Sequence, residues 1–101
     1  MAILAIFTGK GISKEQYEAL RKEVHWENTL PKGAIIHIAS FDESGDAHVA
    51  DVWSSSEELN EFVATRLMPA MQKLKIPPPK VDVYPTHNIN AYSAVSQYIL
   101  K

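Results

Sequence analysis

Three residues that can do chemistry lie on apolar stretches of this sequence. His37 is flanked by isoleucines, Asp51 lies between alanine and valine, and Trp53 follows two positions later. An imidazole that titrates near neutrality is a natural general base, and a carboxylate among apolar neighbours is costly unless it is paired. We therefore take His37 and Asp51 as candidate catalytic residues and Trp53 as a candidate pocket wall.

Each of these residues also has a purely structural explanation. His37 is expected to be buried, and a core histidine satisfied by one hydrogen bond fits its position. Asp51 fits an ion pair across a dimer or an edge position in a sheet. Trp53 fits core packing or a helix staple. The sequence leaves both explanations open for all three residues.

His48, His87 and Tyr17 complete the candidate pocket residues. The segment from His87 to Tyr92 is rich in hydrogen-bonding groups, which suit either a pocket closure, a crossing to a partner subunit, or a polar loop whose asparagines cap turns. The histidines are not spaced closely enough along the sequence to indicate a metal site. The glycines around Lys10 lack the GK[ST] pattern of a phosphate loop. We expect no cofactor.

Composition narrows the class of protein. The chain has 101 residues, is 46% hydrophobic and 22% charged, and carries a formal net charge of −2, so an ordinary globular domain is expected and nucleic-acid binding is not. The absence of cysteine excludes disulfides. The apolar run Ala2–Phe7 is far shorter than the roughly 20 residues of a membrane span. We expect a cytoplasmic protein without membrane contact.

The spacing of apolar residues and the helix caps predict the strands and helices in chain order. The run 2–7 is a strand, and Ser13 with Gln16 forms a capping box for a helix that ends near Val24. Strands follow over 34–41 and 47–53, and Ser54 or Ser55 caps a second helix that Pro69 kinks or restarts. The last core strand is 81–84, and residues 93–100 form a short helix that persists only by docking.

The hairpin after Phe41 determines which side chains share a face. A four-residue loop places Ala47 opposite Asp42. His37 and His48 then share one face and line one cavity, whereas Asp51 and Trp53 lie on the other face. Large apolar groups occur on both faces, so neither face is expected to be freely solvated.

The order β-α-β-β-α-β predicts an α+β, ferredoxin-like fold with a four-stranded antiparallel sheet and both helices on one face. We expect a single domain over 1–101, with a core of about 1–85 and a tail of 86–101 that docks on the core or on a partner. Because the other face of the sheet is also apolar, we expect a homodimer whose sheets pack as a dimeric α/β barrel.

The segment Asp51–Ser54 followed by Glu57-Glu58-Leu59 resembles the dimeric α/β-barrel superfamily, which includes antibiotic-biosynthesis-monooxygenase-like proteins. The resemblance covers roughly residues 1 to 90. Haem-degrading members carry a first-strand asparagine and a second-helix histidine, which this chain lacks. Quinol-type monooxygenases carry an asparagine ahead of the tryptophan, where this chain has Val49. Only Trp53 matches.

The resemblance and the polar groups on apolar strands together indicate a small enzyme that needs no cofactor. It would be a monooxygenase or an isomerase acting on a hydrophobic, oxygen-bearing ring compound. The alternative is a dimeric module without catalysis that binds a small hydrophobic ligand or serves in a stress response.

Overall fold

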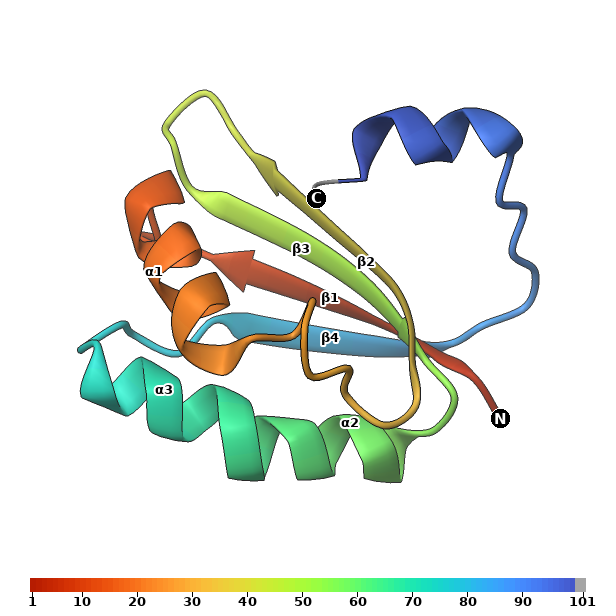
Figure 1. The fold of residues 1–101 in the computed structure, drawn as a ribbon, viewed down its shortest axis with the longest axis horizontal. Coiled ribbons are helices and arrows are strands. Elements are labelled where there is room, and N and C mark those ends of the chain that lie inside the picture. Colours follow the sequence, from red (N-terminus) through yellow and green to blue (C-terminus); the bar gives the residue numbers. More distant parts are fainter. Residues whose placement is uncertain (100–101) are drawn as a thin grey trace.

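The computed structural model describes residues 1–99, and the last two positions of the predicted tail, Leu100 and Lys101, lie outside the described residues. A single antiparallel sheet carries one layer of helices on one face, in which α1 and a second helical rod lie side by side (Figure 1). The elements are β1 (Ile3–Gly9), α1 (Lys14–Val24), β2 (Ala34–Phe41), β3 (Ala47–Trp53), α2 (Ser56–Phe62), η1 (Val63–Leu67), α3 (Met68–Lys73), β4 (Lys80–Pro85) and η2 (Ser93–Tyr98).

The strand order β2-β3-β1-β4 confirms the ferredoxin-like α+β fold. Both central strands are paired on each side, and β2 and β4 form the two edges. The sheet of one chain is therefore open, so a barrel would need a second sheet.

The first helix begins and ends where its sequence signals place it. The Ser13 side chain accepts a hydrogen bond from the Gln16 backbone, and the Gln16 side chain accepts one from the Ser13 backbone, which completes the predicted capping box. His25 closes the helix in the left-handed conformation at φ 59°. Arg66 donates to the carbonyl of Val24, which the end of α1 leaves free, and to the carbonyl of Thr29 in the loop that follows.

The second helical rod contains the predicted interruption near Pro69. Ser55 caps α2, after which the rod widens into a π-helical segment, η1, before α3 continues with Pro69 in its first turn. Proline has no N–H to donate and crowds the preceding turn, so the wider segment accommodates the residue without ending the rod.

The helix-facing side of the sheet carries the core. Odd-numbered residues of β1 and β3 face the helices and form clusters with α1 and with the second helical rod. Ile3, Ala5, Trp53 and Leu59 are buried in one cluster, and Met71 on α3 is 2% exposed in the other. The other side, which we call the open face, carries no helix. Its apolar residues are Leu4, Ile6, Ile36, Ile38, Ala50, Val52 and Tyr84, of which Val52 is buried and Ile38 and Tyr84 are more than half exposed.

The predicted hairpin register was wrong by one residue. Ala47 pairs with Phe41, and Asp42 faces Asp46 through a hydrogen bond from Asp42 N to Asp46 O. The loop is therefore a turn closed by Gly45 N on Asp42 O, with Gly45 at φ 85°. A turn followed by a left-handed glycine is the usual three-residue hairpin loop. The shift puts Asp51 and Trp53 on the same face as His37 and moves His48 to the open face.

Candidate functional site

Four predicted residues meet in one chain of hydrogen bonds on the helix-facing side of the sheet. His37 on β2 is the register partner of Asp51 on β3, and their side chains bond at 2.7 Å between Nδ1 and Oδ1. The Tyr17 hydroxyl of α1 lies 2.8 Å from the other ring nitrogen, Nε2. The Trp53 indole N–H donates to the second carboxylate oxygen of Asp51 at 3.2 Å.

These contacts define the direction of donation. A carboxylate only accepts, so the Asp51 oxygens receive the Nδ1 proton of His37 and the indole proton of Trp53. In a neutral imidazole the remaining nitrogen, Nε2, is then the acceptor for the Tyr17 hydroxyl. The Asp51 side chain is 10% exposed and both of its oxygens are paired, which satisfies the requirement for a buried carboxylate.

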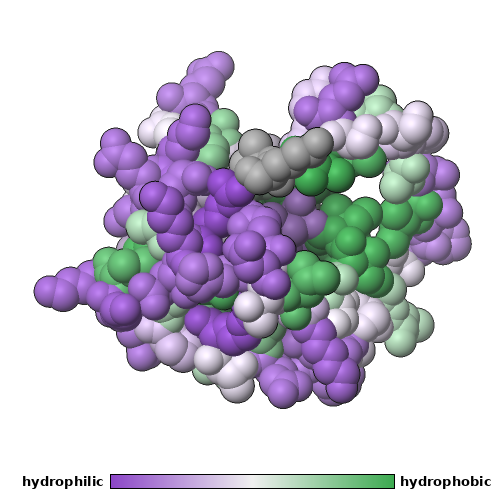
Figure 2. Space-filling model, viewed as in Figure 1, coloured by the Kyte–Doolittle hydropathy of each residue, from purple (hydrophilic) through white to green (hydrophobic). Residues whose placement is uncertain are grey.

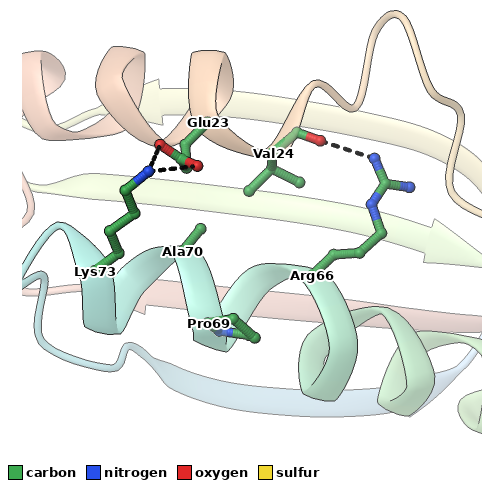
Figure 3. Close-up of a pocket in the computed structure, with 6 residues that line it drawn as sticks. All are labelled: Glu23, Val24, Arg66, Pro69, Ala70 and Lys73. Carbon is green, nitrogen blue, oxygen red and sulfur yellow. Dashed lines mark hydrogen bonds and ion pairs between the residues drawn. The ribbon is translucent and has the colours of Figure 1, made fainter.

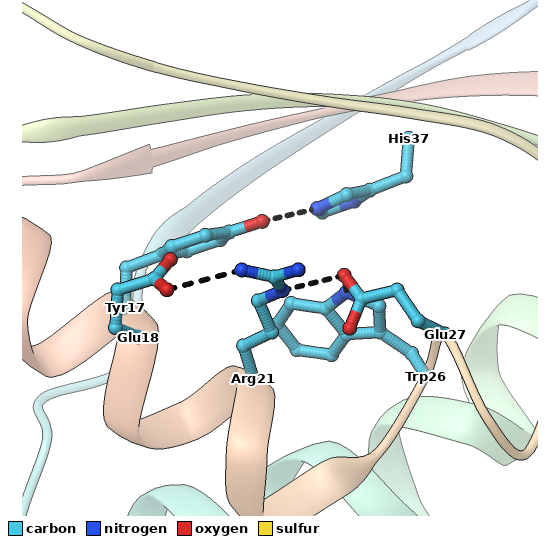
Figure 4. Close-up of polar contacts among 6 residues, drawn as sticks. All are labelled: Tyr17, Glu18, Arg21, Trp26, Glu27 and His37. Carbon is cyan, nitrogen blue, oxygen red and sulfur yellow. Dashed lines mark hydrogen bonds and ion pairs between the residues drawn. The ribbon is translucent and has the colours of Figure 1, made fainter. Parts of the chain in front are cut away.

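Aromatic rings pack around the Tyr17–His37 part of this chain, where Figure 4 shows the Trp26 ring beside both residues. The Trp26 ring lies against Tyr17 and His37 at centroid distances of 5.6 Å and 5.2 Å, and Phe41 meets Tyr17 edge-on at 5.7 Å. Burial, followed by the charge of Glu27, raises the pKa of Tyr17 above its ordinary value. The hydroxyl is therefore a neutral donor at physiological pH.

A surface ion-pair cluster holds Trp26 in place. Glu27 accepts from the Trp26 indole at 2.9 Å and from the Arg21 Nε at 2.7 Å, and Arg21 also bonds Glu18 at 3.0 Å (Figure 4). Sequence reasoning did not select Trp26, Glu27 or Arg21. The one available signal was a tryptophan directly after a helix end, which by itself does not show what it covers.

Two expectations about the histidines were wrong. His37 was expected to be buried, but its side chain is 34% exposed because β2 is an edge strand. His48 was expected to share a cavity with His37, but it lies on the open face and bonds Asp42 at 2.7 Å. His87 lies exposed in the segment after β4. The structure thus groups Tyr17, His37, Asp51 and Trp53 and leaves His48 and His87 apart.

Trp53 also has the core role that was its structural alternative. Its side chain is 2% exposed and its ring packs against Phe62 at a centroid distance of 5.2 Å. The indole therefore links the core to the Asp51 carboxylate and positions that carboxylate toward His37.

Hollows on the surface lie away from this group. One of about 330 Å³ lies between α1 and α3, where the Lys73–Glu23 ion pair and the Arg66 contact to Val24 border it (Figure 3). A second, of about 140 Å³, lies beside α2 and the loop before β2. Neither is lined by His37, Asp51 or Trp53.

Residues 1–99 show neither a metal-binding cluster nor a membrane-spanning helix. No cluster of three or more metal-binding side chains occurs within this range. None of the helices over the same residues has the length and apolarity that a bilayer crossing requires.

Comparison with known proteins finds likeness in structure only. No protein-family model and no curated protein matches the sequence. A conserved protein from Methanosarcina mazei Go1 superimposes with a TM-score of 0.63 at 13% identity, over 83% of this chain and 91% of that one. SnoaB, a cofactor-independent oxygenase from Streptomyces nogalater, gives 0.59 at 13% identity, over 87% and 93%.

A third solved structure carries the family description expected from the sequence. It is a candidate antibiotic biosynthesis monooxygenase from Deinococcus radiodurans, with a TM-score of 0.56 at 19% identity over 92% of this chain and 100% of that one. Identity this low establishes a shared fold. The resemblance to antibiotic-biosynthesis-monooxygenase-like proteins is confirmed at that level.

Proposed function

We propose that this protein is a cofactor-independent enzyme, a monooxygenase or an isomerase, acting on a hydrophobic ring compound that bears an oxygen function. The observation that carries the proposal is the hydrogen-bonded chain Asp51–His37–Tyr17 beneath aromatic rings. A fold shared with the oxygenase SnoaB supports the choice of reaction class.

His37 is the general base in this proposal. Nε2 takes the proton of the Tyr17 hydroxyl as Tyr17 takes one from an acidic O–H or C–H of the substrate. The resulting imidazolium is stabilised by Asp51, which accepts at Nδ1, and Trp53 keeps the carboxylate in that orientation. The substrate is left as an anion delocalised into its ring.

Two outcomes follow from that anion. In an isomerase, the proton returns to a different carbon. In a monooxygenase, a substrate methylene reacts with dioxygen: two C–H bonds and the O–O bond break, one oxygen atom becomes a ring carbonyl and the other leaves as water. The substrate carbon supplies all four electrons, so the atoms and electrons balance with dioxygen as the only oxidant.

The open face supports a homodimer as the working assembly. Ile38 is 56% exposed and Tyr84 is 52% exposed on a sheet face that carries no helix. Burying apolar surface of this kind contributes roughly 25 cal/mol for each Å². A second copy that packs sheet against sheet covers this face and completes the dimeric barrel.

A specific observation favours the second candidate, a binding module without catalysis. Both nitrogens of His37 are already hydrogen-bonded within the chain, and the two hollows described above are lined by other residues. In this alternative the Tyr17–His37–Asp51 chain holds α1 against the sheet.

Turnover by single variants tests the two candidates. We expect His37→Ala and Asp51→Asn each to reduce turnover of a panel of two- and three-ring phenols and ketones by about 10²- to 10⁴-fold. Oxygen uptake reports oxygenation, and deuterium incorporation from ²H₂O reports proton transfer at carbon. His25→Asn, at an exposed left-handed position that asparagine tolerates, is the matched control and should keep the wild-type rate.

Unchanged rates in both variants on a substrate that the wild type converts would overturn the catalytic assignment. Binding of panel members without turnover by the wild type would favour the binding module.

A further inference from the structure

The chain after β4 forms an arm that makes little contact with its own domain. We define the arm as residues 86–99. Its one backbone hydrogen bond to the core runs from Thr86 N to Ala2 O at 3.0 Å, and every residue from His87 to Ile99 is exposed. Figure 1 shows the arm leaving the sheet, and Figure 2 shows an opening between it and the rest of the molecule.

The arm presents an apolar ridge. Tyr92, Val95 and Tyr98 recur every third residue. Val95 and Tyr98 lie in the 3₁₀ helix η2, in which side chains three apart eclipse one another, and Tyr92 precedes that helix as its N-cap. Their exposed fractions are 74%, 53% and 80%. A six-residue 3₁₀ helix has no stability of its own in water, so the ridge needs a surface to pack against.

The same chain carries a second unpartnered apolar surface at the edge of the open face. Ile38 of β2 is 56% exposed, and Ile35, at the bulge where β2 begins, is 51% exposed. Residues 86–91 reach at most about 20 Å, compared with roughly 15 Å between the edge strands of a four-stranded sheet. Residues 86–91 are therefore long enough to cross the full width of one sheet, from one edge strand to the other.

The exposed area matches the requirement of a stable dimer. The apolar side chains of the arm present on the order of 500 Å². They are Ile89, Tyr92, Val95, Tyr98 and Ile99. In a two-fold dimer each chain gives one arm and receives one, so each chain buries the side chains of its own arm and also the surface that receives the partner's arm. Together these areas are of the same order as the roughly 800 Å² per partner of a standard interface.

We propose that the arm of each chain docks through the Tyr92–Val95–Tyr98 ridge onto the β2 edge of the open face of a second copy of this chain. This rests on the proposed homodimer and adds to it a reciprocal exchange of arms. In that dimer the partner's sheet covers the middle of the open face, and the partner's arm covers the β2 edge of that face.

Intermolecular spin labelling tests the docking site. Because the chain has no cysteine, Ser96→Cys takes a single nitroxide on the arm. The labelled protein is mixed with ¹⁵N-labelled protein that carries no nitroxide. We expect broadening of the amide signals of Ile36–Ser40 in the ¹⁵N chain. A second sample carries the nitroxide and the ¹⁵N label on the same chain and is diluted until monomers dominate. If the signals broaden only in this sample, the arm docks on its own sheet, and the proposal is overturned.

Ridge variants separate this proposal from the homodimer itself. Tyr92→Ser combined with Tyr98→Ser should raise the dimer dissociation constant at least about tenfold in sedimentation equilibrium. Ala94→Ser, on the same helix but off the ridge, should leave it unchanged. A dimer that the ridge variant does not weaken, without intermolecular broadening, would overturn arm exchange and leave the homodimer standing. A wild-type monomer at every concentration would overturn both.

Discussion

At the scale of single residues, Asp51 shows how a buried carboxylate is accommodated. One oxygen pairs with the His37 imidazole and the other with the Trp53 indole. The sequence indicated that Asp51 needed a partner, because an unpaired charge among apolar residues is costly. The identity of the partner depends on the strand register, in which His37 lies directly opposite.

Glu58 is a second carboxylate with a defined structural task. It accepts from the side chains of Ser54 and Ser55, and its backbone N–H donates to the Ser55 hydroxyl at the start of α2. Hydrogen bonds from Ser54 and then Ser55 lower the pKa of Glu58. A carboxyl whose pKa is lower in the folded state stabilises the fold above its unfolded pKa, about 4.3, and loses that contribution as pH falls through the folded value.

We therefore predict that Glu58→Gln lowers the thermal midpoint at pH 7 and that the difference from wild type shrinks as the pH falls below about 4. Thermal melts followed by circular dichroism between pH 2.5 and pH 7 measure this difference in the thermal midpoint. Glu57→Gln, one position away and exposed, is the control. A difference that stays constant with pH would contradict a role for the charge.

At the scale of elements, the π-helical segment η1 connects two parts of the fold. It carries Arg66, whose guanidinium donates to the Val24 and Thr29 carbonyls at 2.8 Å each and lies 5.3 Å from the Phe62 ring centroid. A cation at the C-terminus of a helix meets the negative end of its dipole. One residue thus fastens the end of α1 and the following loop, which carries Trp26, to the second rod.

Arg66→Met should lower the free energy of unfolding by about 1–3 kcal/mol, since hydrogen bonds from a charged donor are lost while the apolar stem is kept. Urea denaturation measures the change. Lys73→Met removes an exposed ion pair with Glu23 from the same rod and should cost less than about 1 kcal/mol. Equal losses for the two variants would indicate that Arg66 acts only as a surface charge.

At the scale of the whole molecule, the helices cover only one side of the sheet. The other side keeps Ile38 and Tyr84 more than half exposed, which is unusual for a soluble monomer. The sequence already contained this information, because large apolar residues alternate onto both faces of the strands. Which residues form the open face became clear only with the register.

Ile38→Asp is predicted to convert the proposed dimer to monomers at micromolar concentration, because the open face would bury an unpaired charge. Sedimentation equilibrium measures the oligomeric state of the variant, and its melting temperature should no longer depend on protein concentration. Leu30→Asp, at a loop position that is 77% exposed, is the control and should remain dimeric. A wild-type chain that sediments as a monomer would contradict the prediction.

Local signals in the sequence determined the element order and most element ends. The Ser13–Gln16 capping box, the Ser55 cap and the interruption near Pro69 depend on residues within one or two turns of each other, so they can be found without knowing the fold. The β-α-β-β-α-β order then left few arrangements of the sheet.

Only the tertiary structure decided which polar groups meet. One left-handed glycine, Gly45, sets the hairpin loop, and a change of one residue there moves every side chain of β3 to the opposite face. That shift brings Asp51 to His37 and takes His48 away. Tyr17 joins them from α1, twenty residues from His37, through helix packing that periodicity alone does not specify.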